Sequence, residues 1–428
     1  MMDIPKKLKE DRIDYIQFQF TNLNGEFKEV EFPAIIWEDM KGGTGIDGSS
    51  LGFLSIEQSD IKILPDLSTY SILSYNKRIA RFICDIYNND GKPYNACPRH
   101  ILKRQLEKIK SQGYLLLVRP ELEWYFITKD LNPADKGTYM DMPPKDEFHE
   151  LRRSICDDLI EAKIPIKTIH HEVGPSQQEV EFIENPALFQ ADNVQTAKTL
   201  IKIRAHENDM IASFMPKPFT EEAGSGLHIH QYLMKDGKNI FAGEGTQISE
   251  NLRYYIGGIQ KHVNAISAIL NPLINSYHRL KPNYEAPVFT SWGIGNRTAL
   301  IRVPGYEKSA RIEYRAGDSG MNIYLGIAVL LAAGMDGIKH KIEPNIPTSK
   351  NSDNLTQKER EELGIKQLPK NLKESLEACE KNKLILKVLG EQCVKKYLSL
   401  KYEELSEYEK AKTSEDMRKW ELTRYLNC

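Results

Sequence analysis

Charged residues recur at a spacing of two in three segments that lie far apart in the sequence. The segments are Glu121-Leu122-Glu123, His228-Ile229-His230 and Arg311-Ile312-Glu313-Tyr314-Arg315. On a β-strand, residues i and i+2 point to the same face, so each segment presents its charges together and turns its apolar residues to the other face. Carboxylates, imidazoles and guanidinium groups concentrated in this way need a polyvalent counterpart, which divalent cations and phosphates supply. The pattern therefore predicts a metal-dependent phosphoryl-transfer site in front of a hydrophobic core.

Length and composition indicate an ordinary globular protein with two domains. The chain has 428 residues, which is too long for one small hydrophobic core. Hydrophobic residues make up 40% and charged residues 28% of the chain, and 58 basic residues nearly balance 60 acidic ones. This balance lacks the positive excess of nucleic-acid-binding proteins, so we expect no nucleic-acid partner.

The cysteines and the apolar segments indicate in which cellular compartment the protein is expected and whether it spans a membrane. Six cysteines are scattered without a CxxC pair, which argues against a zinc site and a disulfide scaffold. The N-terminus is charged and lacks the apolar core of a secretory signal, so we expect the reducing cytoplasm. The most apolar stretch, residues 322–338, contains Gly326, Gly334 and Asp336 and predicts a buried core helix, with no membrane span.

Turn and helix signals divide the chain near Pro98. We expect a small α+β domain over residues 1–97, with strands such as 15–20 and 78–87, and a mixed catalytic domain over residues 98–428. The predicted helices are 99–112, 147–163, 193–209 and an amphipathic set within 373–428. The polar segment 351–370 is expected to be an exposed excursion.

Five carboxylates and one imidazole are the candidate metal ligands. They are Glu121, Glu123, Glu172, Glu179, Glu313 and His228. Hard oxygen donors with a single nitrogen favour Mg²⁺ or Mn²⁺ over zinc or copper. Each residue alone is ordinarily a solvated strand residue, so the prediction depends on their joint occurrence.

Five arginines follow in a short stretch that is also rich in glycine. They are Arg279, Arg297, Arg302, Arg311 and Arg315. Arginine binds carboxylate and phosphate oxygens through a bidentate fork, so the group suits phosphoryl transfer beside a second anion, although a surface ion-pair network is the alternative. The segments 44–50, with Asp47, and 275–288, with Glu285, are either plain loops or parts of such a site, where Glu285 could act on a lid.

These residues belong to a series of ten motifs. The motifs are Asp47-Gly48-Ser49-Ser50, Glu57-Gln58-Ser59-Asp60, Glu121-Leu122-Glu123, His170-His171-Glu172-Val173, Phe214-Met215-Pro216-Lys217-Pro218, Gly224-Ser225-Gly226-Leu227-His228-Ile229-His230, Asn275-Ser276-Tyr277-His278-Arg279-Leu280, Tyr284-Glu285-Ala286-Pro287, Asn296-Arg297 and Arg311 through Arg315. In this order, they make the chain resemble type I glutamine synthetase over nearly its whole length. The resemblance implies an α+β fold with a β-grasp-like N-terminal domain. It also implies a glutamine-synthetase/guanidino-kinase-type catalytic domain, in which helices flank a curved antiparallel sheet.

The resemblance implies an activity as well. The family ligates ammonia to the γ-carboxylate of L-glutamate through γ-glutamyl phosphate, with ATP as co-substrate and two or three Mg²⁺ or Mn²⁺ ions per active site. It also implies a homo-oligomer with active sites between subunits, expected to be a dodecamer of two hexameric rings, and no membrane partner. In that assembly Asp47 would come from the adjacent subunit.

Roles are carried over residue by residue. One metal would take Glu123, Glu172 and Glu179, and the other would take Glu121, His228 and Glu313. The glutamate-binding residues would be Gly224, Arg279 and Arg315. The ATP-binding residues would be His230, Arg297, Arg302, Lys308 and Arg311. The ammonium-site residues would be Asp47, Tyr139, Glu172 and Glu285, and catalytic roles would fall to Asp47, Glu285 and Arg297.

Several positions depart from the family pattern. They are Ala223 where glutamine-forming members carry Asn, Ser176 and Gln178 around Gln177, Tyr232 in place of a small hydroxyl residue, and Lys167 in place of an acidic residue. Ser55 replaces the Arg of feedback-regulated relatives, and Asn354-Leu355-Thr356 lacks the tyrosine that some relatives adenylylate. The acceptor therefore stays open between ammonia and an organic amine such as a polyamine or ethanolamine. A non-catalytic structural or regulatory member is a third reading, although none of the six metal ligands is lost.

Overall fold

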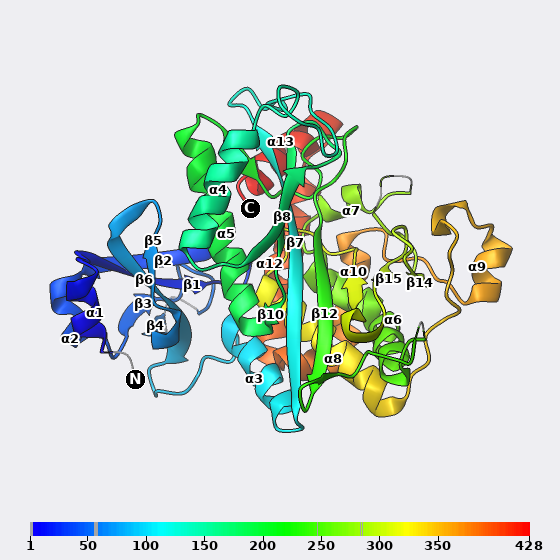
Figure 1. Ribbon diagram of the computed structural model, residues 1–428, viewed down its shortest axis with the longest axis horizontal. Coiled ribbons are helices and arrows are strands. Elements are labelled where there is room, and N and C mark those ends of the chain that lie inside the picture. Colours follow the sequence, from blue (N-terminus) through cyan, green and yellow to red (C-terminus); the bar gives the residue numbers. More distant parts are fainter. Residues whose placement is uncertain (1–2, 55–58, 246, 283, 285) are drawn as a thin grey trace.

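The structure is a computed structural model that describes residues 3–54, 59–245, 247–282, 284 and 286–428. Two sheets organise it. In Figure 1 the N-terminal sheet lies at the left in blue, and the larger sheet lies at the centre around the long strands β7 and β12. The helices α4 and α5 lie between them in this view.

The N-terminal sheet has six strands in the order β2-β1-β6-β4-β3, with β5 paired to β6. The elements are α1 (Ile4–Glu10), β1 (Tyr15–Thr21), β2 (Phe27–Pro33), α2 (Trp37–Met40), β3 (Thr44–Asp47), β4 (Asp60–Pro65), β5 (Ser71–Leu73) and β6 (Asn76–Asn88). Both predicted strands, 15–20 and 78–87, are confirmed as β1 and β6, which pair in parallel. Phe18, Trp37 and Phe82 pack together in the core of this sheet.

The larger sheet has ten strands, and its main path runs β14-β15-β16-β12-β7-β9-β8. The strands are β7 (Tyr114–Ile127), β8 (Ile166–His171), β9 (Gln177–Phe182), β10 (Asn185–Pro186), β11 (Ile211–Ser213), β12 (Leu227–Lys235), β13 (Lys238–Asn239), β14 (Trp292–Ile294), β15 (Ile301–Val303) and β16 (Ile312–Tyr314). All described pairs in this sheet are antiparallel except β14 with β15, which makes the sheet mixed.

Helices pack against this sheet and against one another. They are α3 (Pro98–Lys110), α4 (His149–Glu161), α5 (Ala187–Glu207), α6 (Glu250–Leu270), α7 (Ser276–Arg279), α8 (Ile323–His340), α9 (Gln357–Leu363), α10 (Leu372–Lys381), α11 (Lys383–Leu389), α12 (Glu391–Tyr408) and α13 (Ser414–Tyr425). The helix predicted at 193–209 begins six residues earlier, at Ala187. Its first turns are buried on most sides, so they carry little of the amphipathic period on which such a prediction depends.

Helix α8 forms the centre of the larger core. It is long and apolar enough to cross a membrane by length and composition, but 72% of it is buried inside the protein, as expected for a core helix. Arg99 at the start of α3 connects the two sheets, because it pairs with Asp66 and Asp85 on one side and with Asp192 of α5 on the other. The domain boundary between residues 97 and 98 stays a prediction.

The segment 351–370 is the expected exposed excursion only in part, because half of its residues are exposed and several others are buried. Leu355, Ile365 and Leu368 are each 5% exposed or less, and the Leu368 amide donates to the Val288 carbonyl. The prediction missed these three buried apolar side chains, which anchor a segment whose composition is otherwise polar. The short helix α9 completes it, closed by a capping box between Thr356 and Glu359.

Candidate active site

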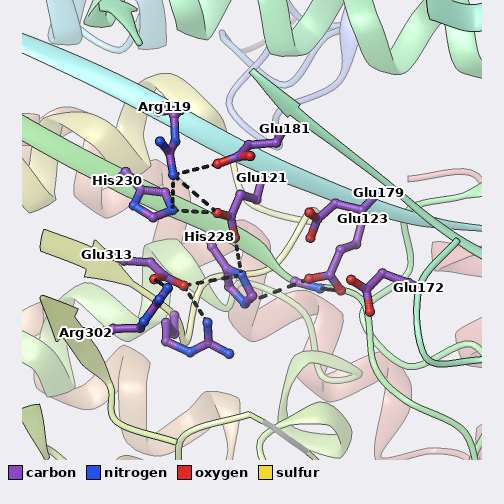
Figure 2. A network of polar contacts seen from close by, with 12 residues as sticks. Arg119, Glu121, Glu123, Glu172, Glu179, Glu181, His228, His230, Arg302 and Glu313 are labelled. Carbon is purple, nitrogen blue, oxygen red and sulfur yellow. Dashed lines mark hydrogen bonds and ion pairs between the residues drawn. The ribbon is translucent and has the colours of Figure 1, made fainter. Parts of the chain in front are cut away.

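Strand pairing brings the charged triplets together on one face of the larger sheet. In the antiparallel register His228 lies opposite Glu121, Glu123 lies opposite Glu179, and His230 lies opposite Glu313. The alternate residues Leu122, Ile229 and Ile312 are fully buried, as the period of two requires. Figure 2 shows the polar side chains pointing toward one another in a single cluster.

One side of the cluster, which we call the arginine-paired half, consists of Glu121, His228 and Glu313 with the cations that bind them. Glu121 Oε2 lies 3.0 Å from His228 Nδ1, and its Oε1 lies 2.6 Å from His230 Nε2. Glu313 is fully buried and accepts from Arg302 Nη1 at 2.7 Å and from Arg315 Nη1 at 2.5 Å.

The charges in the arginine-paired half are nearly balanced. Burial alone would raise the pKa of Glu121, but the hydrogen bonds from His228 and His230 hold that pKa well below its usual value. Burial would also raise the pKa of Glu313, yet the charges of His230 and Arg315 lower it to about 2. Both carboxylates are therefore ionised at neutral pH without any added ion.

The other side, which we call the carboxylate half, consists of Glu123, Glu172 and Glu179. Its donors are mostly neutral. Glu123 Oε2 accepts from the Gly226 amide at 2.8 Å and from Gln177 Nε2 at 3.2 Å. The nearest imidazole is His170, whose Nε2 lies 3.1 Å from Glu179 Oε1 and whose Nδ1 lies 3.7 Å from Glu172 Oε1, while His228 Nε2 of the other half lies 3.9 Å from Glu123 Oε1.

In the carboxylate half, the pKa values of Glu172 and Glu179 are raised, whereas those of the carboxylates in the other half are lowered. Burial and, after it, the charges of Glu123 and Glu179 together raise the pKa of Glu172 to about 8. The pKa of Glu179 is raised as well, first by burial and then by Glu121 and Glu123, against the hydrogen bond from His170. The pKa of His170 is raised to about 9, because its contacts with Glu179 and Glu172 outweigh its burial. This half holds more negative charge than the protein neutralises.

The cluster has the donor chemistry of a site for hard divalent cations. Ligand atoms within 4.8 Å of one another occur in three groups, which are Glu121/His230/Glu313, Glu121/Glu179/His228 and His170/Glu172/Glu179. Carboxylate oxygens with a minority of imidazole nitrogens fit Mg²⁺ or Mn²⁺. Two further imidazoles, His170 and His230, lie in the cluster beside His228, the one imidazole among the predicted ligands, whose metal-binding role stays a prediction.

The predicted glutamate-binding residues lie next to this cluster. Arg279 is 3% exposed and donates to the carbonyls of Ala316 at 2.7 Å and Arg315 at 3.1 Å, and no carboxylate of the described residues pairs with it. Gly226 permits its close approach, since a Cβ there would lie 2.7 Å from Arg279 Nη2 and 2.9 Å from His228 Nε2. Gly224 packs on the aliphatic part of Arg279 in the same way. Among the described residues, the buried guanidinium thus has neutral carbonyl partners but no anionic one, and an anionic ligand would balance its charge.

The predicted ATP-binding residues differ in how closely they approach the cluster. Arg302 pairs with Glu313, and Arg311 Nε donates to His230 Nδ1 at 3.1 Å. His230 is buried between Arg311 and Glu121. Arg297 and Lys308 are exposed.

The predicted ammonium-site residues are not all brought together within one chain. The ring of Tyr139 packs edge-on against His170 with centroids 5.4 Å apart, which places it beside the carboxylate half. Asp47 ends β3 in the N-terminal sheet, where it accepts from the Ser49 amide and from the hydroxyls of Ser49 and Ser50. These bonds hold the pKa of Asp47 well below its usual value. Glu285 lies outside the described residues, as does Ser55.

Three polar residues of the cluster escaped the sequence prediction. Arg119 binds Glu181 Oε1 at 2.6 Å and lies 3.4 Å from His230 Nε2, and His170 contacts two carboxylates as described above. Each stands two residues from a predicted ligand: Arg119 before Glu121, His170 before Glu172, and Glu181 after Glu179. The spacing of two would have identified all of them if it had been extended along each strand.

Two departures from the family pattern have structural partners in this chain. Ser176 has φ 64°, a left-handed conformation, and its amide donates to Asp135 Oδ1 at 2.6 Å, while its hydroxyl accepts from the Asp135 amide. Gln178 Oε1 accepts from Arg152, which also holds Asp146. Both side chains are fully buried in these networks, so they support the end of β8, which Glu172 follows, and β9, which carries Glu179.

The other departures line the far side of the cluster and the loop before Gly224. Lys167 Nζ pairs with Glu181 Oε2 at 3.0 Å, and the ring of Tyr232 lies under Arg311 with 5.7 Å between Cζ and the ring centre. The Ala223 carbonyl accepts from the Tyr125 hydroxyl at 2.6 Å.

Comparison with known proteins identifies the family. Residues 95–425 match the family described as glutamine synthetase, catalytic domain, and residues 12–89 match glutamine synthetase, beta-Grasp domain. The chain belongs to the glutamine synthetase family. It is therefore an enzyme of the ligase class, from a family that acts on glutamate.

Similar proteins cover the chain almost completely. Glutamine synthetase of Thermotoga maritima is 42% identical over 99% of this chain and 98% of its own length. Glutamine synthetase of Methanosarcina mazei is 40% identical over 99% and 97%. Among solved structures, a GmaS/ADP complex superposes with a TM-score of 0.90 at 27% identity and covers all of both chains. Both predicted folds, the β-grasp domain and the catalytic domain, are thereby confirmed.

Proposed function

We propose that this glutamine synthetase family member ligates ammonia to the γ-carboxylate of L-glutamate through γ-glutamyl phosphate, with conversion of ATP to ADP and phosphate. The observation that carries the proposal is the convergence of Glu121, Glu123, Glu172, Glu179, His228 and Glu313 in one cluster, beside the buried guanidinium of Arg279, which binds backbone carbonyls and pairs with no carboxylate of the described residues. The identity of about 40% to curated glutamine synthetases supports the same acceptor.

The proposed cofactors are two or three Mg²⁺ or Mn²⁺ ions. The carboxylate half and the arginine-paired half would each hold one, with His170 available to a further ion beside Glu172 and Glu179. When bound, such ions neutralise phosphate oxygens where negative charge develops during phosphoryl transfer. The excess negative charge of the carboxylate half fits this assignment, since a divalent cation would replace the protons that it otherwise retains.

The arginines of the chain would orient the two substrates. Arg279 and Arg315, beside Gly224, would bind the α-carboxylate of glutamate, since a planar guanidinium matches a carboxylate in a bidentate fork. Arg297, Arg302, Lys308, Arg311 and His230 would face the phosphates of ATP. A glutamate carboxylate is a poor electrophile, so phosphorylation has to precede amide formation, and fixed cations stabilise the charge that this step generates.

Ammonium has to lose a proton before it can attack the acyl phosphate. We assign this to an anionic site of Asp47, Tyr139, Glu172 and Glu285, with Asp47 as the base that accepts the proton. Asp47 belongs to the N-terminal sheet and the cluster to the other sheet, which fits a site completed by an adjacent subunit in a dodecamer. Glu285 would exclude water, which otherwise hydrolyses the intermediate. The cytoplasm remains the predicted compartment, where the six free cysteines stay reduced.

A γ-glutamyl ligase for an organic amine is the second candidate. Ala223 stands in the loop that leads to Gly224, and Tyr125 holds its carbonyl in place. The methyl side chain of Ala223 is smaller than an asparagine side chain, so it leaves more room for an acceptor, and it makes no hydrogen bonds.

An assay of phosphate release distinguishes the ammonia-dependent activity from the activity with an organic amine. The full-length protein is incubated with ATP, Mg²⁺ and glutamate, with ammonia or one of a panel of organic amines. Stimulation by ammonia supports the first proposal, and stimulation by an organic amine alone replaces it with the second. In parallel, Asp47→Ala is expected to abolish amide formation and to retain some glutamate-dependent ATP hydrolysis, because only the amine step needs that carboxylate. Unchanged amidation in this variant would refute the role of Asp47.

A further inference from the structure

The C-terminal helix α13 reaches the segment that carries Arg279. Glu421 of α13 is 3% exposed although it is a carboxylate. Its Oε2 accepts from Asn275 Nδ2 at 2.8 Å, and its Oε1 lies 2.8 Å from His278 Nε2 and accepts from the Tyr408 hydroxyl at 3.2 Å. Helices α7 and α13 both lie in the upper half of Figure 1. One buried carboxylate thus ties the end of the chain to the short helix α7.

Asn275 also links Glu421 to the segment 216–218, which lies beside the loop that contains Gly224. Its Oδ1 accepts from the Lys217 amide at 2.7 Å, and its Nδ2 donates to the Lys217 carbonyl at 3.2 Å. A neighbour of Glu421 on the same helix, Arg418, donates to the Pro218 carbonyl. The segment 216–218 in turn supports the loop that contains Gly224, since the Ser225 amide donates to the Pro216 carbonyl at 2.8 Å. Helix α13 therefore contacts both α7, which carries Arg279, and the segment 216–218, which supports the Gly224 loop.

The dependence on an external support has a physical cause. Helix α7 is a single turn, Ser276–Arg279, without a side-chain N-cap, and a helix of that length has no stability of its own. Hydrogen bonds to an ionised carboxylate are stronger than neutral ones. Burial would raise the pKa of Glu421, but the contacts from His278, Asn275 and Tyr408 hold it below its usual value, so the carboxylate is charged at neutral pH.

We propose that Glu421 is a positioning residue that fixes Arg279 and the Gly224 loop for glutamate, so that the C-terminal helix sets the affinity for this substrate. The inference rests on the proposed use of Arg279 as a glutamate-binding residue. The metal ligands and the ATP-binding residues stand on strands of the larger sheet or on its connecting loops, and none of their described side chains contacts Glu421. The effect of its loss is therefore confined to one substrate.

The test compares two buried glutamates of the C-terminal helices. Glu421→Gln removes the charge and keeps the size. Glu404→Gln is the matched control, because Glu404 is 4% exposed and binds Lys401 and the Tyr425 hydroxyl, which links α12 to α13 without contact to residues 275–279. KM for glutamate, KM for ATP and kcat are measured on the full-length protein, together with its thermal unfolding.

Glu421→Gln is expected to raise KM for glutamate about tenfold, within the range that small misplacements of binding groups cause, while KM for ATP stays within about twofold. Glu404→Gln is expected to leave both constants within about twofold. His278→Ala, at a partly exposed position, is expected to raise KM for glutamate about threefold, and it serves if Glu421→Gln does not fold.

Each result decides the matter. A folded Glu421→Gln protein with unchanged KM for glutamate, or with an equal loss for both substrates, would overturn the inference, and so would an unchanged KM in His278→Ala. Failure of the proposed function itself looks different, because wild-type protein would then show no glutamate-dependent phosphate release at all.

Discussion

The two halves of the ligand cluster contain the same type of carboxylate but differ in what neutralises it. In the arginine-paired half, Glu313 is held by Arg302 and Arg315, and its pKa lies far below the usual value. In the carboxylate half no guanidinium group pairs with the three carboxylates among the described residues, whose imidazole partners are His170 on Glu172 and Glu179 and, at 3.9 Å, His228 on Glu123; the pKa of Glu172 rises to about 8. The protein itself completes the charge balance of one half, and the other half is where we propose that a bound cation completes it.

This difference teaches that buried carboxylates of one site can have opposite effects on stability. A carboxylate that is paired with buried guanidinium groups leaves them uncompensated when it is removed. A carboxylate that is crowded by others relieves repulsion when it is removed. Four predictions follow from this contrast, each of which breaks or sharpens it.

The largest expected effect is the loss of Glu313. Glu313→Gln leaves two buried guanidinium groups without their carboxylate, and we expect the metal-free protein to lose about 3 kcal/mol of unfolding free energy. Urea unfolding in the presence of a chelator measures this loss. A stability within about 0.5 kcal/mol of the wild-type value would show that the arginine-paired half is not balanced as described.

Removal of Glu179 is expected to act in the opposite direction. Glu179→Gln relieves repulsion with Glu121 and Glu123, so the metal-free protein becomes more stable, whereas the thermal shift produced by Mg²⁺ or Mn²⁺ shrinks. Activity falls by about 100-fold or more, at the upper end of the losses that changes around a metal cause. Thermal unfolding with and without metal gives the comparison. Equal destabilisation by Glu313→Gln and Glu179→Gln would remove the contrast between the halves.

The third prediction concerns pH. Because the pKa of Glu172 is raised to about 8, protons compete with the metal below that pH, and apparent metal affinity should rise by up to about tenfold per pH unit from pH 6 to 8 and then level off. The same raised pKa means that the folded metal-free protein binds this proton more tightly than the unfolded chain does. Its contribution to stability is therefore lost as pH rises through about 8. Calorimetric titration of metal at several pH values measures the affinity, and a flat profile would contradict the assignment.

The smallest effect is expected from a change of Ser176, which supports the strands next to the carboxylate half. Ser176→Gly removes the hydroxyl that accepts from Asp135 and also removes a left-handed serine. The two changes oppose each other, so we expect the unfolding free energy to shift by less than about 1 kcal/mol. Metal affinity should stay within about twofold. Ser176→Ala is the control, since it loses the hydroxyl but retains the strain, and it should be the less stable of the two.

The sequence predicted the charged strand faces of the cluster better than it predicted their surroundings. The spacing of Glu121 with Glu123 and of His228 with His230 follows from a local rule, because a strand alternates its faces whatever it pairs with. The same rule applied further would have found Arg119 and His170. The buried anchors Leu355 and Leu368 escaped prediction because their segment is polar on average, and burial of single residues depends on contacts that are remote in the chain.

Sequence alone thus determined which faces of the strands are charged, the two-part division of the chain, the core helix α8 and, through ten ordered motifs, the family. Only the tertiary structure decided which charges meet. The register that sets Glu123 opposite Glu179, the arginines on Glu313 and the contact of Glu421 with Asn275 and His278 join residues separated by up to 146 positions. Local spacing carries no information about such pairings, because they depend on how strands and helices pack, and that packing decides which carboxylates are neutralised and which still require a cation.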